Sequence, residues 1–337
     1  YRYNEDIFKK ITTLPDGKNH GLVFVLDWSG SMQYVLEDTI KQLYNLIWFC
    51  RKVQIPFDVY AFTNEWSREE RYSKELPEHY EKREGIFQVE SCFNLMNVLT
   101  SKVNAKTLEH QMLNIYRLVA SFSRRTWYRY PERMVLSGTP LNEALVSLHQ
   151  ILPQFQKDNK VEKVQCIILT DGEASYLPYH KLIDRSWMNS DEESFIGCRN
   201  VHPGRTFLRD RKLGKTYGFK YAYHEFTEVF LNNLKDKFPT VNFIGIRVMP
   251  NREANRFIRL YHPSGDERLS NEWKKNKSFA IKNSGYDDYF GMSANSLADD
   301  SEFEVQEDAT KAQIKRAFVK SLKVKKLNKK VLGEFIS

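Results

Sequence analysis

The sequence predicts an α/β fold, with a doubly wound, mostly parallel sheet and helices on both of its faces. Residues 21–26 (GLVFVL) and 164–170 (VQCIILT) are continuous apolar runs, each followed at once by polar and turn residues. Such runs are typical of strands that are buried on both faces. Elsewhere, apolar residues recur every three or four positions, which indicates helices between the strands. Strands that alternate with helices predict parallel βαβ units.

The first half of the chain supplies a helix, a strand and an irregular region after the first apolar run. Residues 34–53 have helical spacing with charged residues between the apolar ones, and residues 56–62 (PFDVYAF) are typical of a strand. Residues 64–85 are rich in Glu, Arg and Tyr, which predicts an exposed insertion. Helical spacing returns over residues 91–123, and we expect a helix there.

The second half predicts further alternating elements. Residues 142–152 form a predicted helix that Pro153 is expected to end. After the strand 164–170, residues 173–220 have no clear period. The pattern then predicts, in order, a helix over 223–238, a strand over 241–249, a short helix over 252–261, an edge strand over 278–282 and a terminal helix over 309–327.

A length of 337 residues suits one large domain with insertions or two ordinary domains. No stretch approaches the roughly 18 consecutive apolar residues of a membrane-spanning helix, so we expect no membrane segment. The chain starts at Tyr1, and we expect it to be part of a longer protein. We divide it into an extension at 1–19, a domain at 20–310 with insertions at about 64–130 and 173–220, and a basic helix or tail at 311–337.

Charge and cysteine content bear on partners and compartment. The net charge is +8, and residues 311–330 hold nine Lys or Arg and no acid. Such a segment is more often the solvated face of a terminal helix, and it can also bind nucleic acid or anionic lipid. The four cysteines are far apart and form no CxxC pair. We therefore expect buried free thiols in a reducing compartment, with a cytoplasmic location.

Oxygen-bearing side chains follow both apolar strands and precede one helix. Asp27, Ser29 and Ser31 come directly after the first strand, Thr139 lies in the turn before helix 142–152, and Asp171 follows the second strand. Carboxyl ends of parallel strands meet at one edge of a sheet. Two carboxylates and three hydroxyls make an all-oxygen site that suits Mg²⁺, Mn²⁺ or Ca²⁺. The alternative is a set of polar caps without a metal.

These three motifs, in this order and context, resemble the metal-ion-dependent adhesion site of von Willebrand factor A (VWA) domains. The resemblance implies that Ser29 and Ser31 bind the ion directly, and that Asp27 and Asp171 act directly or through water. Thr139 would move on or off the metal. It also implies a coordination position left open for an Asp or Glu of a partner protein.

The residues beside these motifs are candidates for the rim that contacts the partner. Trp28 lies within the first motif, Arg133 precedes the Thr139 turn and Glu173 follows Asp171. We expect Trp28, Arg133 and Glu173 to line the metal face and influence the choice of partner. For the two charged residues, the alternative is a solvated rim with no partner.

Residues 58–63 (DVYAFT), with Trp66 after them, resemble a strand of the CobT-type VWA subunit of cobaltochelatase, of which phage-encoded versions exist. This resemblance implies a MoxR-class AAA+ ATPase as partner, in a chelatase-like or remodelling complex. No G-x-S-x-G elbow, HExxH pair or complete P-loop occurs in the sequence. We therefore expect an adaptor that docks a partner and has no catalysis of its own.

Two other functions stay open. The first is a nucleic-acid-associated VWA protein that binds RNA or DNA through its basic tail and the insertion at 173–220. The residues that favour it in that insertion are Arg199, Arg205, Arg209, Arg211, Tyr217 and Tyr221. The second is an extracellular adhesin, which the cysteine pattern and the lack of a secretory signal disfavour.

Overall fold

The computed structural model describes most of the chain between its two ends. The predicted extension 1–19, the predicted terminal helix 309–327 and the basic segment 311–337 lie outside the described residues. Those residues are 20–73, 80–123, 130–172, 174, 177–184, 194–220, 223–282 and 284–294.

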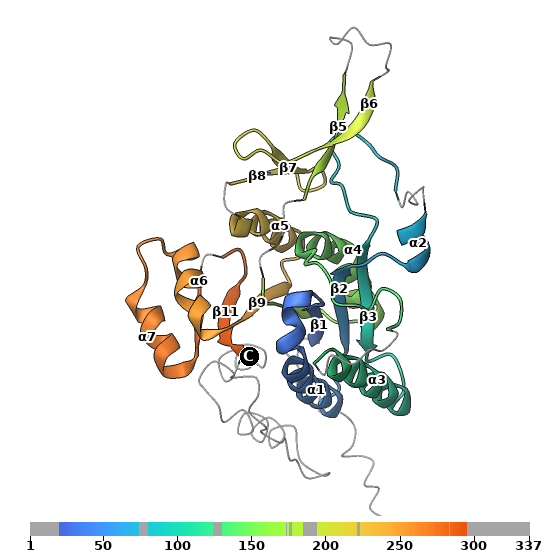
Figure 1. The fold of residues 1–337 in the computed structure, drawn as a ribbon, viewed down its shortest axis with the longest axis vertical. Coiled ribbons are helices and arrows are strands. Elements are labelled where there is room, and N and C mark those ends of the chain that lie inside the picture. The colour runs from blue at the N-terminus through green and yellow to red at the C-terminus, as the bar shows by residue number, and fades with distance from the viewer. Residues whose placement is uncertain are drawn as a thin grey trace, which may run out of the picture.

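A seven-stranded sheet forms the centre of the molecule (Figure 1). Five neighbouring strands run parallel, and one antiparallel strand closes each edge. This arrangement confirms the predicted α/β fold with a mostly parallel sheet. The strands are β1 (His20–Asp27), β2 (Phe57–Asn64), β3 (Phe93–Thr100), β4 (Lys163–Thr170), β9 (Val241–Met249), β10 (Ser278–Ile281) and β11 (Asp288–Ser293), in the spatial order β10-β11-β9-β4-β1-β2-β3.

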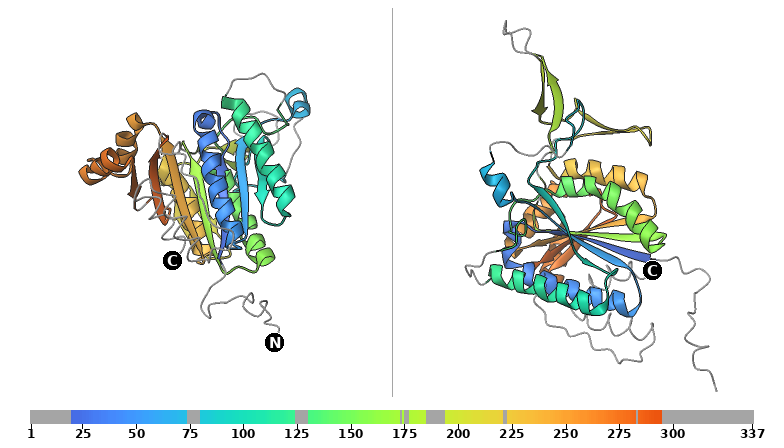
Figure 2. Two further views of the ribbon diagram at one scale, coloured as in Figure 1. Left: turned by 90° about the horizontal axis from the view of Figure 1, so that it is seen from below. Right: turned by 90° about the vertical axis from the view of Figure 1, so that its right-hand side faces the viewer.

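Helices cover both faces of the sheet, as the right-hand view of Figure 2 shows. The helices α1 (Leu36–Lys52) and α3 (Ala105–Ser123) pack on one face, and α4 (Leu141–Asn159) and α5 (Tyr223–Lys237) pack on the other. Two shorter helices, α6 (Ala254–Tyr261) and α7 (Glu267–Asn276), lie beside the β10–β11 edge.

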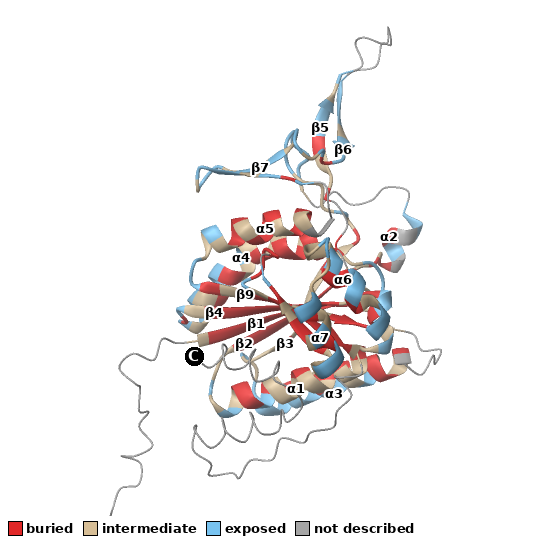
Figure 3. Ribbon diagram, turned by 90° about the vertical axis from the view of Figure 1, so that its left-hand side faces the viewer, coloured by how far each residue is buried: buried red, intermediate tan, exposed pale blue. Residues whose placement is uncertain are grey.

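The apolar strands are buried because both of their faces meet a helical layer (Figure 3). In β1, Val23 and Val25 belong to the cluster under α4 and α5, whereas Leu22, Phe24 and Leu26 belong to the cluster under α1 and α3. Side chains of a strand alternate between the faces of its sheet. A strand covered on both faces therefore has no polar positions, which explains the continuous apolar runs.

The strand order reverses between β1 and β4. From β1, the chain adds β2 and then β3 on one side, and it returns to place β4 and then β9 on the other side. In doubly wound sheets, ligands bind beyond the carboxyl ends of the strands at this switch point. Asp27 is the last residue of β1 and Asp171 directly follows β4. The fold thus places both carboxylates at the edge where a ligand site is expected.

Two predictions about helices were wrong, one from helical spacing and one from the position of a proline. Residues 93–100 form the edge strand β3, which pairs antiparallel with β2 and buries Leu99, so only the second half of 91–123 is helical. The backbone N–H and C=O groups at the open side of β2 pair with this segment, and this pairing outweighed the helical spacing of its apolar residues. The helix α4 also passes through Pro153 and ends at Asn159. Leu152 and Phe155 on either side of the proline are buried, and this burial offsets the lost backbone hydrogen bond.

The region 173–220 contains two hairpins that extend away from the sheet, at the top of Figure 1. They are formed by β5 (Tyr179–Ile183) with β6 (Phe195–Arg199), and by β7 (Phe207–Asp210) with β8 (Lys215–Gly218). Leu177, Val201 and Phe219 flank the hairpins and are buried in the cluster under α4 and α5. The hairpins are therefore anchored to the domain at their bases.

All four cysteines are free thiols. Cys50, Cys92 and Cys166 are buried, as expected, but Cys198 is exposed because it lies in β6, a strand of a two-stranded hairpin whose residues are mostly exposed. Within the described ranges, no helix has the length and apolar character required to cross a lipid bilayer.

Candidate functional site

Asp27 is the centre of the candidate site. Its side chain is fully buried, and Oδ2 accepts a hydrogen bond of 2.6 Å from the hydroxyl of Thr170, at the end of β4. Oδ1 is also buried and has no hydrogen-bond partner within the described residues. Burial raises the pKa of Asp27 to about 7, because removal from water disfavours the charged form. A buried carboxylate oxygen without a donor is a position that a cation would stabilise.

The loop after β1 carries two hydroxyls, and one of them is hydrogen-bonded to Asp171. The Oγ atoms of Ser29 and Ser31 lie 3.0 Å apart, and Ser31 donates a hydrogen bond of 2.8 Å to Oδ1 of Asp171. The short 3-10 helix η2 (Gly30–Tyr34) bends the chain so that both serines turn to the same side. Ser29 is buried whereas Ser31 is exposed, so the site opens to solvent at Ser31.

The Thr139 loop lies against the Asp27 loop through backbone contacts. Gly30 donates its backbone N–H to the carbonyl of Ser137 at 2.8 Å, and Ser137 donates to the carbonyl of Trp28 at 3.3 Å. Thr139 follows two residues later, is partly buried and lies just before α4. Within the described residues, no hydrogen bond joins its hydroxyl to the other four side chains. The structure thus links Ser29, Ser31 and Asp171 through side-chain hydrogen bonds. It places Asp27 at the start of the same loop and Thr139 in the adjoining loop.

The prediction that Trp28 lines a partner-binding rim was wrong. Its side chain is completely buried, its indole Nε1 donates a hydrogen bond of 2.8 Å to the carbonyl of Met134, and its ring packs edge-on against Phe122. The sheet edge is covered at this point by α3 and the segment before Thr139, so an apolar ring is enclosed. Trp28 therefore holds the Asp27 loop and the Thr139 segment together.

The two charged rim candidates have different outcomes. Arg133 has a left-handed backbone (φ 63°) and directs its guanidinium to Glu70, in the short helix α2 (Arg68–Tyr72), at 2.8 Å. It also donates a hydrogen bond of 3.1 Å to Asn94 in β3. These contacts tie Arg133 to the β2–β3 connection, and its role at the rim stays a prediction. Glu173 lies outside the described residues.

Three residues that the sequence analysis did not single out act on the site. Thr170 supplies the hydrogen bond to Asp27. Arg247 at the end of β9 and Glu253 in the 3-10 helix η4 (Asn251–Glu253) are close enough to Asp171 to shift the pKa of its carboxyl. Burial raises that pKa most, the Ser31 hydrogen bond and Arg247 lower it, and Glu253 raises it. Arg247 could have been noticed as the single charged residue of a mostly apolar strand.

The donor set fits a hard divalent cation in its chemistry. Within the described residues, no group of three or more His, Cys, Asp or Glu side chains could hold a metal. The candidate set has two carboxylates, and its other members are hydroxyls. Oxygen donors of this kind suit Mg²⁺, Mn²⁺ or Ca²⁺, and the unpartnered Oδ1 of Asp27 is the position where a cation would replace missing hydrogen bonds.

Two residues of the proposed nucleic-acid surface make contacts within the domain. Tyr217 donates a hydrogen bond of 2.7 Å to Asp236 of α5, and Arg209 donates one of 2.6 Å to Thr216 within its own hairpin. Lys215 also pairs with Asp236 at 2.7 Å. These contacts hold the β7–β8 hairpin against α5. Tyr221 lies outside the described residues.

Comparison with known proteins gives limited information. No protein-family model matches the chain, and no curated protein matches it. Among similar solved structures, the pilus adhesin SpaC from Lactobacillus rhamnosus GG, in its open conformation, is 16% identical over 91% of this chain and 30% of its own, with a TM-score of 0.40. The vWF domain of the type V pili tip protein Mfa5 from Porphyromonas gingivalis is 8% identical over 92% of this chain and 97% of its own, with a TM-score of 0.38.

A variant of the PilB minor pilin from Streptococcus sanguinis is 12% identical over 92% of this chain and 62% of its own, with a TM-score of 0.37. The chain therefore spans less than two thirds of SpaC and of PilB. Similarity at this level carries no argument about family or function, which must come from the site itself.

Proposed function

We propose that this chain is a VWA-type protein-interaction subunit that holds a divalent cation, Mg²⁺ or else Mn²⁺ or Ca²⁺, and docks an acidic side chain of a partner there. The observation that carries the proposal is the buried Oδ1 of Asp27, which accepts no hydrogen bond from the residues that the structure describes and lies at the switch point of the sheet. Ser29, Ser31 and Asp171 supply the neighbouring oxygens.

The burial of each candidate ligand would set its position around the ion. Asp27 and Ser29 are buried and would hold the inner side of the ion, and Thr170 would orient the Asp27 carboxylate. Ser31 is exposed and Asp171 is partly exposed, so the outer side would face the partner. The cation would supply the positive charge that attracts the partner's carboxylate. Thr139, in the adjoining loop, is the fifth candidate ligand.

For the partner, we propose a MoxR-class AAA+ ATPase in a chelatase-like or remodelling complex in the cytoplasm. The support is the resemblance of residues 58–63 to the CobT-type subunit. In the structure this run belongs to β2, where Phe62 and Thr63 are fully buried. The run therefore serves the core of the domain, and the surface that would meet an ATPase has to be found by experiment.

Thermal unfolding with and without Mg²⁺ tests the cation. A ligand that binds only the folded state raises the unfolding temperature. We expect Mg²⁺ to stabilise the wild type, excess chelator to reverse the effect, and Asp27→Asn to abolish it. Asp58→Asn is the matched control. Asp58 is also a buried aspartate whose Oδ1 has no hydrogen-bond partner among the described residues, but it lies at the start of β2, away from the strand ends that carry the site. A Mg²⁺ effect that persists in Asp27→Asn would refute the site.

Partner capture tests the docking. The purified chain is immobilised, incubated with a purified MoxR-class ATPase from the same source, and washed with Mg²⁺ or with chelator. We expect retention in Mg²⁺ that is lost in chelator and in Asp27→Ala, and kept in Asp58→Asn. Retention that is equal in all four conditions would contradict metal-dependent docking. No retention in any condition would exclude this class of ATPase as the partner.

A further inference from the structure

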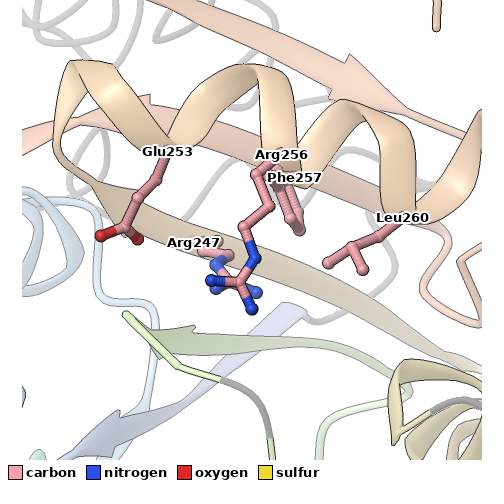
Figure 4. A pocket seen from close by; sticks show the side chains of 5 residues that line it. All are labelled: Arg247, Glu253, Arg256, Phe257 and Leu260. Atoms are coloured by element: carbon pink, nitrogen blue, oxygen red, sulfur yellow. The ribbon is translucent and has the colours of Figure 1, made fainter.

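A basic pocket of about 230 Å³ lies beside the candidate metal site. It is lined by Arg247 from β9 and by Glu253, Arg256, Phe257 and Leu260 from η4 and α6 (Figure 4). Figure 4 shows the Arg256 side chain extending from the helix towards Arg247 on the strand below. Two guanidinium groups with one carboxylate give the pocket a net positive charge.

Arg247 is held in place by an aromatic ring. Its guanidinium carbon lies 4.7 Å from the centroid of the buried Phe257 ring. A guanidinium stacked in this way keeps its N–H donors in its own plane, where they match the geometry of a carboxylate. Arg256 is exposed on the same helix, so it can close on a bound group from the solvent side.

The pocket and the metal site are neighbours in the sheet. Arg247 pairs in register with Thr170, the residue directly before Asp171. Adjacent strands are roughly 4.8 Å apart. Arg247 lowers the pKa of the Asp171 carboxyl and Glu253 raises it, so both charged groups lie within electrostatic range of Asp171. A partner segment bound at Asp171 would therefore pass the mouth of the pocket.

We propose that the Arg247–Arg256 pocket binds a second acidic side chain of the same partner segment whose first acidic side chain docks at the Asp27–Asp171 site. This inference rests on the proposed function. Alternate side chains of an extended peptide are about 6.6 Å apart and point to the same side. The segment therefore carries two Asp or Glu residues that are close in sequence. Glu253 favours a singly charged carboxylate over a more highly charged phosphate, because it adds repulsion at the pocket wall.

A displayed library of random 12-residue peptides tests the inference with the full chain. Peptides are bound in Mg²⁺ and released with chelator. We expect wild-type protein to select peptides with two acidic positions at a fixed spacing. Arg256→Ala should still select the first acidic position but lose the second. Arg259→Ala is the matched control, since Arg259 is exposed on the same helix but does not line the pocket, and it should select both.

The affinity of one selected peptide measures how much the second acidic contact contributes to binding. Replacing its second acid by the corresponding amide should weaken binding to the wild type about tenfold, since a charge-assisted pair contributes about that factor. The same replacement should have little effect on Arg256→Ala. Selection of a single acidic position by the wild type, or of two by Arg256→Ala, would overturn the second contact alone. Absence of any chelator-released peptide would overturn the proposed function as well.

Discussion

The hydroxyl of Thr170 donates a hydrogen bond of 2.6 Å to the buried carboxylate of Asp27. The two residues are 143 positions apart in the chain, and each ends a parallel strand. This contact spans the switch point of the sheet, and it orients the one carboxylate of the site that is fully removed from solvent. Several measurable properties depend on it and on its surroundings.

Thr170→Val should destabilise the folded chain by about 1–3 kcal/mol at pH 8, because Asp27 would lose a donor while it stays buried. Thr170→Ser keeps the hydroxyl and serves as the control, with a much smaller loss expected. Urea denaturation followed by circular dichroism measures both. A loss in Thr170→Ser with no loss in Thr170→Val would show that the methyl group matters and the hydrogen bond does not.

Trp28→Phe should weaken Mg²⁺ binding without removing any candidate ligand. The variant keeps an aromatic ring but loses the hydrogen bond from the indole to the carbonyl of Met134. We expect a stability loss of about 1–2 kcal/mol and a looser connection between the Asp27 loop and the Thr139 segment. Titration calorimetry with Mg²⁺ measures the affinity. An unchanged affinity would mean that Trp28 only fills the core.

His149 should make the chain sensitive to mild acid. Burial, with Lys237 nearby, lowers its pKa to about 4 from its ordinary value of 6.5, so the folded state holds it neutral. Between these values the unfolded chain binds a proton that the folded chain does not, and stability therefore falls as the pH falls from 6.5 to 4. Asp210 faces the same ring with opposite charge and moderates the effect.

The expected contribution of His149 is about 1–2 kcal/mol after allowance for its partial exposure. Denaturation at pH 7 and at pH 4.5 would measure it, with His149→Gln as the comparison. The glutamine variant should lose less stability between the two pH values than the wild type. A loss equal to that of the wild type would assign the acid sensitivity to other groups.

Pro153→Ala should stabilise the chain by about 1–2 kcal/mol. The proline lies inside α4, where it cannot donate to the carbonyl of His149 four residues earlier, and alanine restores that donor. The proline lowers the entropy of the unfolded chain, which limits the gain. Thermal unfolding measures the change. A destabilised variant would show that the core requires the local bend that the proline imposes.

The sequence alone predicted the architecture because the architecture depends on local patterns. The runs 21–26 and 164–170 are typical of strands covered on both faces, and the helical stripes of α1 and α5 gave the covering layers. Asp27, Ser29 and Ser31 were also recognisable, since they are neighbours in one loop after a buried strand. Their link to Asp171 followed from the rule that parallel strands end at the same edge.

Long-range contacts decided the rest, because they have no local signature. The edge strand β3 has a spacing that also fits a helix, and only the open edge of β2 selects the strand. The sequence predicts Trp28 as a rim residue because it lies within the first motif. In the structure, α3 and the segment before Thr139 enclose its ring. Three residues act on the site only because strands and loops that are distant in sequence are adjacent in space. They are Thr170, Arg247 and Glu253. The sequence thus determined which oxygen-bearing side chains end neighbouring strands and are candidates for a cation site, and only the tertiary structure determined what surrounds them, because those surroundings come from distant segments.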